Sequence, residues 1–314
     1  MTGATGFIGS HLARALVERG DDVSVLARRP DRADPLRMLG CRLVYGELDS
    51  APARSALLAG VELVYHVAGL VQARSLAELR RVNAEGSALL ARDAAACGVS
   101  RFLLVSSQAV TGPSPRGTSI DEASGAGPVT DYGRSKQEGE AAVRAVGLPL
   151  TVVRPSAVYG PGDRAFLPLF RFAASGVFPR LGDGEQELSL VFAGDLVRAL
   201  IAAAESGATL GGTYHAAHAE VVTARQLGEA IGRALGRRVR GLRVPGVALR
   251  GVLRAAHFVA PSKLPSPDKA NELLAPAWRA STDAIRRDAG WQAETDLERG
   301  IATTVAAYRD AGWL

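Results

Sequence analysis

The sequence predicts an α/β protein in which a doubly wound parallel sheet is followed by a smaller, mostly helical portion. Three observations predict it: short apolar runs alternate with helix patterns in the first half, a glycine-rich turn opens a helix near residue 3, and the alternation breaks after Gly160. At 314 residues the chain is longer than most single domains. We therefore expect a first domain over residues 1–160, to which the chain returns at about 189–205, and a second portion over residues 161–314.

The predicted elements follow in a regular order. Apolar runs rich in β-branched residues predict strands at 23–27, 41–46, 61–69 and 101–107, and a strand with its exit at 150–160. Apolar residues at helical spacing predict helices at 8–19, 53–59, 78–97 and 132–146. In the second portion a strand-then-helix pattern covers 191–205, and Thr223 is a candidate N-cap for a helix that ends at Gly236.

The opening stretch MTGATGFIG carries Gly3, Gly6 and Gly9 directly before a helix pattern. Backbone N–H groups in such a turn can approach a pyrophosphate, and the helix dipole adds a favourable potential. Glycines are needed because a Cβ would hold the phosphate away. The turn predicts a dinucleotide site, but it normally follows a buried strand, and only Met1 and Thr2 stand before Gly3. We therefore expect a sheet without its first strand.

The end of the strand at 23–27 indicates which dinucleotide is bound. Selectivity for NAD usually rests on an Asp or Glu at this place, which accepts the ribose 2′-OH. Here Arg28 and Arg29 follow the strand, and the first acid is Asp31. Arg28 is placed to pair with a 2′-phosphate, which favours NADP, with NAD as the alternative. Two ordinary surface arginines are the other reading of the same residues.

Tyr132 and Lys136 are four residues apart in a helix pattern and so share one helix face. A nearby ammonium favours the phenolate, and we expect it to lower the pKa of Tyr132 toward working pH. Tyr132 would then be a general acid or base for a hydroxyl–carbonyl pair. This pair is common by chance and has weight only together with other motifs.

Together these motifs resemble an extended short-chain dehydrogenase/reductase, in the NAD-dependent epimerase/dehydratase family and its branch similar to dihydroflavonol reductases and 3β-hydroxysteroid dehydrogenases. The resemblance runs over essentially the whole chain and implies a Rossmann-type fold. The stretches that carry it are TGATGFIG at 2–9, HVAG at 66–69, Asn83 in VNAEGS, VSSQAVTG at 105–112, Tyr132 with Lys136, RPSAVYGPGD at 154–163 and DLVRAL at 195–200.

The resemblance implies a role for each matching residue. Ser107, Tyr132 and Lys136 would be catalytic: Ser107 would hydrogen-bond the substrate oxygen, and Lys136 would also hold the nicotinamide ribose. Asn83 would organise the strand and a water. Glu47 stands where the family has Asp beside the adenine. The full cofactor-binding set is Gly3, Gly6, Phe7, Ile8, Gly9, Arg28, Glu47, Leu48, Val67, Ala68, Gly69, Asn83, Val105, Tyr132, Lys136, Pro155, Ser156, Ala157 and Val158.

Departures from the family narrow the chemistry. Dehydratases carry an Asp-Glu pair after the catalytic hydroxyl, where this chain has Gln108 and Ala109. Enzymes of sugar nucleotides usually place an Arg shortly before the returning strand, and GEQELSLVFAGD has none. The C-terminal tail and the apolar segment Val244–Pro261 favour a small or medium hydrophobic ketone or alcohol, interconverted by hydride transfer. A nucleotide-sugar epimerase with retained NAD and a catalytically silent dinucleotide-binding sensor or assembly protein stay as alternatives.

Composition excludes several other classes. The net charge is +5, but the arginines are scattered among acidic and apolar residues, which disfavours nucleic-acid binding. No apolar run reaches the length of a membrane span, and Val244–Pro261 is interpreted as a cover of the substrate pocket, with contact to a membrane surface as the alternative. His215, His218 and His257 lack partners at ligand spacing, so we expect no metal site and histidines that face solvent or line a pocket. A cytoplasmic location and, by resemblance, a homodimer are expected.

The start of the chain carries one further expectation from the resemblance. The family has about five apolar residues before the threonine of the turn, and commonly Val where Met1 stands. We expect that the true start lies upstream and that Met1 is an internal Val codon read as a start, which the upstream DNA can test.

Overall fold

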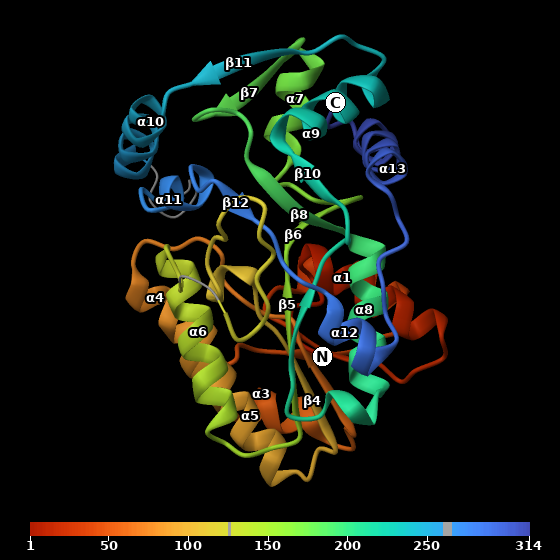
Figure 1. Ribbon diagram of the computed structural model, residues 1–314. Coiled ribbons are helices and arrows are strands. Elements are labelled where there is room, and N and C mark those ends of the chain that lie inside the picture. Colours follow the sequence, from red (N-terminus) through yellow and green to blue (C-terminus); the bar gives the residue numbers. More distant parts are fainter. Residues whose placement is uncertain (125–126, 260–265) are drawn as a thin grey trace.

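The main sheet is parallel and has helices on both faces, as the computed structural model of residues 1–124, 127–259 and 266–314 shows (Figure 1). The predicted fold class is confirmed. In spatial order its strands are β2 (Arg42–Tyr45), β1 (Ser24–Ala27), β3 (Leu63–His66), β4 (Arg101–Val105), β5 (Leu150–Pro155) and β9 (Thr213–Ala216).

Met1 and Thr2 occupy the place between β1 and β3 in the sheet. Thr2 forms parallel bridges to Leu26 of β1 and to His66 of β3. Leu26 N–H donates to the Met1 carbonyl at 3.1 Å, and Thr2 N–H donates to the Tyr65 carbonyl at 3.0 Å. These two residues thus join the β2–β1 pair to the other four strands. The glycine turn follows directly after them.

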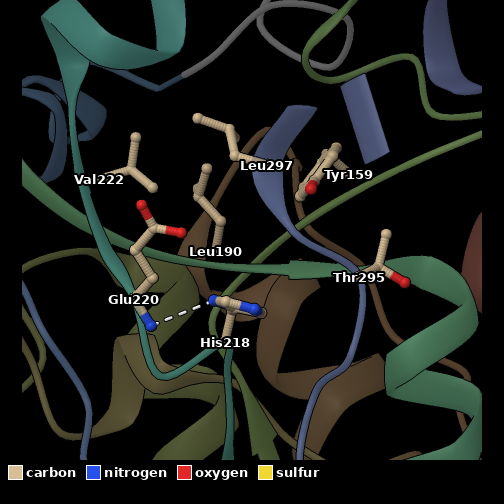
Figure 2. Close-up of a pocket in the computed structure, with 7 residues that line it drawn as sticks. All are labelled: Tyr159, Leu190, His218, Glu220, Val222, Thr295 and Leu297. Carbon is tan, nitrogen blue, oxygen red and sulfur yellow. Dashed lines mark hydrogen bonds between the residues drawn. The ribbon is translucent and has the colours of Figure 1, made fainter. Parts of the chain in front are cut away.

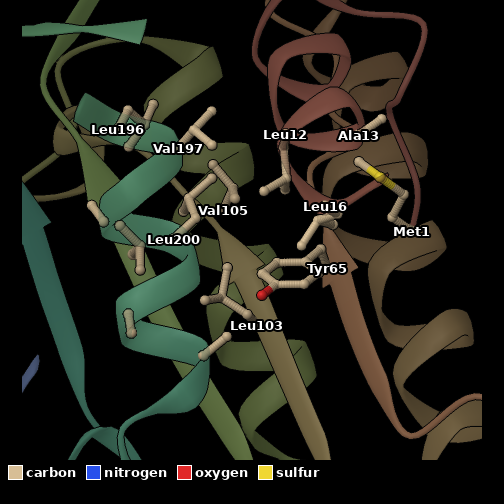
Figure 3. Packing of buried hydrophobic residues seen from close by; sticks show 14 of the residues in the cluster. Met1, Leu12, Ala13, Leu16, Tyr65, Leu103, Val105, Leu196, Val197 and Leu200 are labelled. Carbon is tan, nitrogen blue, oxygen red and sulfur yellow. The ribbon is translucent and has the colours of Figure 1, made fainter. Parts of the chain in front are cut away.

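Alternating side chains of the central strands build two cores, one on each face of the sheet. On one face Leu103 and Val105 of β4 pack with helices α1 (Phe7–Glu18) and α8 (Ala193–Glu205), as Figure 3 shows. On the other face Phe102 and Leu104 pack with α3 (Ala51–Leu58), α5 (Ser87–Ala96) and α6 (Asp131–Arg144). This period of two is the reason that a continuous apolar run reads as a strand buried on both sides.

The remaining helices of this part connect or cover the strands. They are α2 (Pro30–Met38), α4 (Leu76–Arg80) and α12 (Asp283–Ala289). The helix predicted at 78–97 is divided: α4 runs into a π-helical turn, η1 (Arg81–Gly86), and then into α5. Gly139 of α6 packs directly on this turn, since a Cβ at Gly139 would lie 2.2 Å from the Asn83 carbonyl oxygen. The close approach places η1 against the helix that carries Tyr132.

The second portion contains short strands as well as helices. Strand β8 (Glu187–Phe192) pairs with β6 (Ala157–Tyr159), β10 (Val221–Thr223) and β12 (Ala277–Trp278), and β7 (Val177–Leu181) pairs with β11 (Arg240–Val244). The helices are α7 (Leu167–Ala174), α9 (Ala224–Leu235), α10 (Gly246–Val259), α11 (Lys269–Leu273) and α13 (Leu297–Asp310). Helices α7, α9 and α13 share one apolar core.

The return of the chain to the main sheet is made by α8 and β9. The strand part of the predicted segment 189–205 lies in β8, beside β6, whereas α8 covers the main sheet and β9 extends its edge. The predicted N-cap is confirmed: Thr223 and Gln226 form a capping box, and Gly236 ends α9 in the left-handed conformation. Of the apolar segment Val244–Pro261, Ala260 and Pro261 fall outside the described residues.

Candidate active site

The predicted site residues gather at one edge of the main sheet. The strands are parallel, so their carboxyl ends meet there, where ligands bind in open α/β sheets. Arg28 follows β1, and Glu47 with Leu48 follows β2. Val67 to Gly69 follow β3, and Ser107 comes shortly after β4. Pro155 to Val158 lie at the end of β5 and in β6. The glycine turn and the start of α6 lie next to these residues: Gly3 is against Ala68, and Lys136 contacts Val105.

The glycine turn is folded so tightly that backbone touches backbone. Gly3 has φ +76°, and a Cβ there would lie 2.6 Å from the Ala68 nitrogen. Gly6 N–H donates to the Gly3 carbonyl at 2.9 Å. A Cβ at Gly9 would lie 2.1 Å from that same carbonyl oxygen. Gly3 and Gly9 are therefore required by packing inside the turn, and this packing sets the start of α1 against β3.

The first turn of α1 fits a phosphate. Its N-cap, Gly6, supplies no side-chain hydrogen bond, and the first turn has no acidic residue. Thr5 and Gly6 are exposed. The helix therefore presents uncapped N–H groups and an uncompensated positive dipole end, which is the arrangement that binds a pyrophosphate.

The arginines beyond β1 differ in their contacts. Arg29 is paired with Asp31 at 2.8 Å, whereas Arg28 is exposed and, among the described residues, forms no salt bridge. Glu47 is exposed too, and Leu48 packs near Gly86 of η1. Of the two arginines, only Arg28 is left available for a ligand phosphate.

Ser107, Tyr132 and Lys136 come together from β4 and α6. Ser107 begins a short 3₁₀ turn, η2 (Gln108–Val110), and its hydroxyl accepts a hydrogen bond from Ala109 N–H at 3.1 Å. The Tyr132 phenol lies near the same hydroxyl. Lys136 is buried, and its ammonium donates to the Val105 carbonyl at 2.8 Å. The three predicted catalytic residues therefore lie around the carboxyl end of β4.

The prediction that Lys136 lowers the pKa of Tyr132 is wrong for the isolated protein. Burial raises the pKa of Tyr132 to about 12; the nearby Ser107 hydroxyl opposes this shift, and the negative charge of Glu272 adds to it. Burial also lowers the pKa of Lys136 to about 8, against the attraction of Glu140. Desolvation outweighs charge attraction here because Lys136 points at a carbonyl oxygen, so Tyr132 holds its proton at neutral pH.

Asn83 binds the backbone of the loop after β3. Its side chain accepts from Leu70 N–H at 2.7 Å and donates to the Leu70 carbonyl at 2.8 Å. It also donates to the Ser135 hydroxyl at 2.9 Å, and Ser135 donates to the Tyr132 carbonyl at 2.7 Å. Asn83 thereby joins the loop after β3 to the first turn of α6.

A buried polar chain behind the site was missed in the sequence. Thr2 Oγ1 is 2.6 Å from His66 Nδ1, His66 Nε2 is 2.8 Å from Ser87 Oγ, and Ser87 donates to the Asn83 carbonyl at 2.8 Å. Because Ser87 is a donor there, His66 carries its proton on Nε2 and accepts from Thr2 on Nδ1. Burial, with the charge of Lys136 second, lowers the pKa of His66 to about 3, so the imidazole is neutral. Thr2 and His66 stood in the quoted motifs, but their contact spans 64 residues.

A second buried cluster holds the end of β5. Arg154 pairs with Glu140 of α6 through two hydrogen bonds, of 2.9 and 2.7 Å, and donates to the Glu122 carbonyl. His215 of β9 contacts Thr111 at 2.9 Å and donates its backbone N–H to Glu122 at 2.6 Å. The prediction of solvent-facing or pocket-lining histidines is wrong for His215, which is fully buried and whose pKa burial lowers to about 4.

Helix α11 also reaches the site, without any signal in the sequence. Asp268 accepts from Asp131 N–H at 2.6 Å, and Asn271 donates to the Val129 carbonyl at 3.3 Å. These contacts hold α11 beside the first turn of α6 and place Glu272 near Tyr132. They span more than 130 residues, so no local pattern could have shown them.

A small pocket lies elsewhere, around β6 and β8 (Figure 2). His218 lines it, as the sequence suggested for the histidines, and accepts a hydrogen bond from Glu220 N–H at 3.1 Å. Its other lining residues are Tyr159, Leu190, Glu220, Val222, Thr295 and Leu297. None of the predicted cofactor or catalytic residues is among them. Within the described residues, no group of three or more metal-ligating side chains is found, and no helix is long and apolar enough to cross a membrane.

The fold and site define a dinucleotide-binding α/β protein with a serine–tyrosine–lysine cluster beside the cofactor turn. The chain belongs to the NAD dependent epimerase/dehydratase family, whose pattern it matches over residues 1–217. It is 35% identical over 321 residues to a ceramide reductase of Caulobacter vibrioides, covering 100% of this chain and 95% of that protein. It is 27% identical to a 2-alkyl-3-oxoalkanoate reductase of Stenotrophomonas maltophilia over 96% of each chain.

The solved structures agree on the fold. UDP-glucose 4-epimerase of Thermus thermophilus in complex with NAD superposes with a TM-score of 0.78 at 22% identity, over 99% of this chain and 98% of that one. With these relatives the chain is an extended short-chain dehydrogenase/reductase, an NAD-dependent oxidoreductase or epimerase by family. The individual site residues stay predictions.

Proposed function

We propose that the protein is an NADP-preferring reductase that converts a carbonyl on an apolar, hydrocarbon-bearing substrate into an alcohol. The observation that carries the proposal is the cluster of Ser107, Tyr132 and Lys136 around the end of β4, next to the glycine turn. The two reductase relatives act, by their names, on a ceramide and on a 2-alkyl-3-oxoalkanoate, both of which carry hydrocarbon chains. A substrate of this class also agrees with the absence of an arginine from the stretch GEQELSLVFAGD, where enzymes of sugar nucleotides usually have one.

The residues of this chain would divide the work as follows. The bound nicotinamide would supply the hydride. Ser107 would orient the substrate oxygen through a hydrogen bond, and Tyr132 would donate the proton to it. The raised pKa of Tyr132 keeps the phenol protonated at neutral pH, which is the form that reduction requires. Lys136, held by the Val105 carbonyl, would contact the nicotinamide ribose.

The test of the reaction is the variant Tyr132→Phe, assayed with NADPH and a panel of long-chain and short ketones. Removing the proton donor is expected to lower kcat/KM by roughly 10²–10⁴-fold. NADPH affinity, measured by fluorescence, should stay close to that of the unmodified protein. Unchanged turnover in Tyr132→Phe would refute the mechanism. Release of NAD from the purified, denatured protein would instead favour the epimerase with a retained cofactor.

The preference for NADP rests on Arg28. We expect Arg28→Ala to raise the KM for NADPH by roughly 10- to 100-fold, because a charge-assisted bond to a phosphate is worth about 1.5–3 kcal/mol. The KM for NADH should not change, since NADH has no 2′-phosphate. Arg29→Ala is the matched control, because Arg29 already pairs with Asp31. Equal effects on the two cofactors would argue for NAD. The cytoplasmic location and the homodimer stay predictions.

A further inference from the structure

The segment that contains β11 and α10 has an unusual charge. Between Glu229 and Asp268 the chain has no acidic residue. In the chain as a whole the arginines are scattered among acidic residues, but in this stretch they have no acidic neighbours in the sequence. Within this stretch, residues 237–259 contain six exposed arginines: Arg237, Arg238, Arg240, Arg243, Arg250 and Arg254. We call residues 237–259 the basic cap surface.

These arginines lack acidic partners. Arg225 and Arg233, just before the surface, pair with Glu229 and Glu298. In residues 237–259, by contrast, the described structure contains no salt bridge; Arg243 donates to the Gly182 carbonyl at 3.3 Å and Arg250 to the Asn271 amide oxygen at 2.9 Å. The register of β11 on β7 even sets Arg243 beside Arg180. Like charges side by side are unfavourable unless an anion neutralises them.

Helix α10 adds an exposed apolar face to this charge. At 100° per residue, Leu249, Leu253 and His257 share the side that faces the protein, and Leu253 is buried. The opposite arc carries no charge and contains Val247, Val252 and Val259, whose side chains are 85%, 64% and 80% exposed. Arg250 and Arg254 border this arc. Apolar side chains exposed together on one helix face mark an interaction site.

We propose that the basic cap surface docks the protein on a bilayer that contains anionic lipids. A helix with an exposed apolar face and bordering arginines lies in the plane of a membrane interface, where the valines enter the acyl boundary and the guanidinium groups meet phosphates. Nucleic acid would neutralise the charge but would leave the valine face exposed to water. A second copy would bring like charges together. Only an anionic bilayer matches both features, and this inference does not depend on the proposed reaction.

One end of the surface, helix α10, contacts α11, which lies beside the candidate active site. In Figure 1, α10 is at the outer edge of the molecule beside α11. Helix α11 is joined to the start of α6 by Asp268 and Asn271, and α6 carries Tyr132. An apolar substrate dissolved in the bilayer would thus meet the protein close to the catalytic residues.

The test is co-sedimentation of the full chain with vesicles of phosphatidylcholine alone or mixed with phosphatidylglycerol. We expect binding to the anionic vesicles only, which weakens as salt is added. Arg237→Gln/Arg238→Gln/Arg240→Gln should lower the affinity on the order of a hundredfold, from about fivefold per arginine near an anionic surface. Val247→Glu/Val252→Glu should reduce binding to the level seen with phosphatidylcholine.

Controls separate this surface from general charge and from misfolding. Met38→Glu changes a side chain that is 88% exposed on α2, and it should bind vesicles as the unmodified protein does. All variants should keep the circular dichroism spectrum of the unmodified protein. No binding to anionic vesicles at low salt, equal binding by the variants, or preferential binding to DNA or self-association through residues 237–259 would overturn the proposal.

Discussion

Helices α1 and α10 look alike in sequence and have opposite surroundings. Each mixes apolar residues with arginine, and each has a glycine in its interior, Gly9 in α1 and Gly251 in α10. Gly9 is buried against the Gly3 carbonyl, whereas Gly251 is exposed and a Cβ there would meet nothing within 4 Å. Neither glycine has a positive φ. A glycine inside a helix can thus be required by packing or merely tolerated, and the two cases differ only in their tertiary neighbours.

The regions around the two helices differ in the same way. Around α1, the turn, β3 and η1 are joined by backbone contacts and by the buried chain from Thr2 to Asn83. Around α10, side chains are exposed and the arginines have no acidic partner among the described residues. The first region should therefore respond strongly to a single added methyl group or lost hydrogen bond, and the second should respond weakly in stability and strongly in surface binding.

The largest effect is expected for Gly9→Ala. Because the new Cβ would lie 2.1 Å from the Gly3 carbonyl oxygen, the glycine turn and α1 must move apart. We expect a loss of roughly 3 kcal/mol or more in the free energy of unfolding, and at least a hundredfold weaker NADPH binding. Urea denaturation and a fluorescence titration with NADPH measure the two quantities. Stability and affinity equal to those of the unmodified protein would show that the turn is not packed in this way.

The next prediction concerns the loss of stability at low pH. The pKa of His66 is lowered in the folded protein to about 3, so the unfolded chain binds more protons between that value and about 6.5. Stability should therefore be full above pH 6.5 and fall as the pH drops; His66 alone accounts for roughly 3 kcal/mol between pH 6.5 and 4. In His66→Asn this slope should be shallower, although the variant is less stable at pH 7 by roughly 1–3 kcal/mol because Thr2 and Ser87 lose a partner.

Urea unfolding at a series of pH values measures this effect. His215, which burial also keeps neutral, contributes in the same window in both proteins and cancels in the difference. His218→Asn is the control, since that side chain is only partly buried at the pocket of Figure 2. Parallel stability curves for His66→Asn and the unmodified protein would mean that His66 does not carry the acid sensitivity.

The two regions also differ in how far the sequence could predict them. Local patterns were enough to predict the order of strands and helices, the glycine turn and the sheet edge where site residues gather. Apolar residues recur every 2 positions in a strand and every 3.6 in a helix, so short stretches of sequence carry this information. The pKa of Tyr132, the chain through His66 and the approach of α11 could not be predicted. They depend on burial and on partners more than 60 residues away, which a single sequence does not pair.

The smallest expected effect completes the comparison of the two glycines. Gly251→Ala adds a Cβ to an exposed helix interior with no neighbour within 4 Å, so it should stabilise the protein by roughly 0.5–1 kcal/mol through helix propensity. NADPH affinity and turnover should not change, and binding to anionic vesicles should stay or rise slightly, since the added methyl group belongs to the apolar face. Urea denaturation beside Gly9→Ala gives the contrast directly: the same substitution in two helices, with opposite signs. A loss of stability in Gly251→Ala would mean that this face of α10 packs on something in the free protein, which would also contradict its availability to a bilayer.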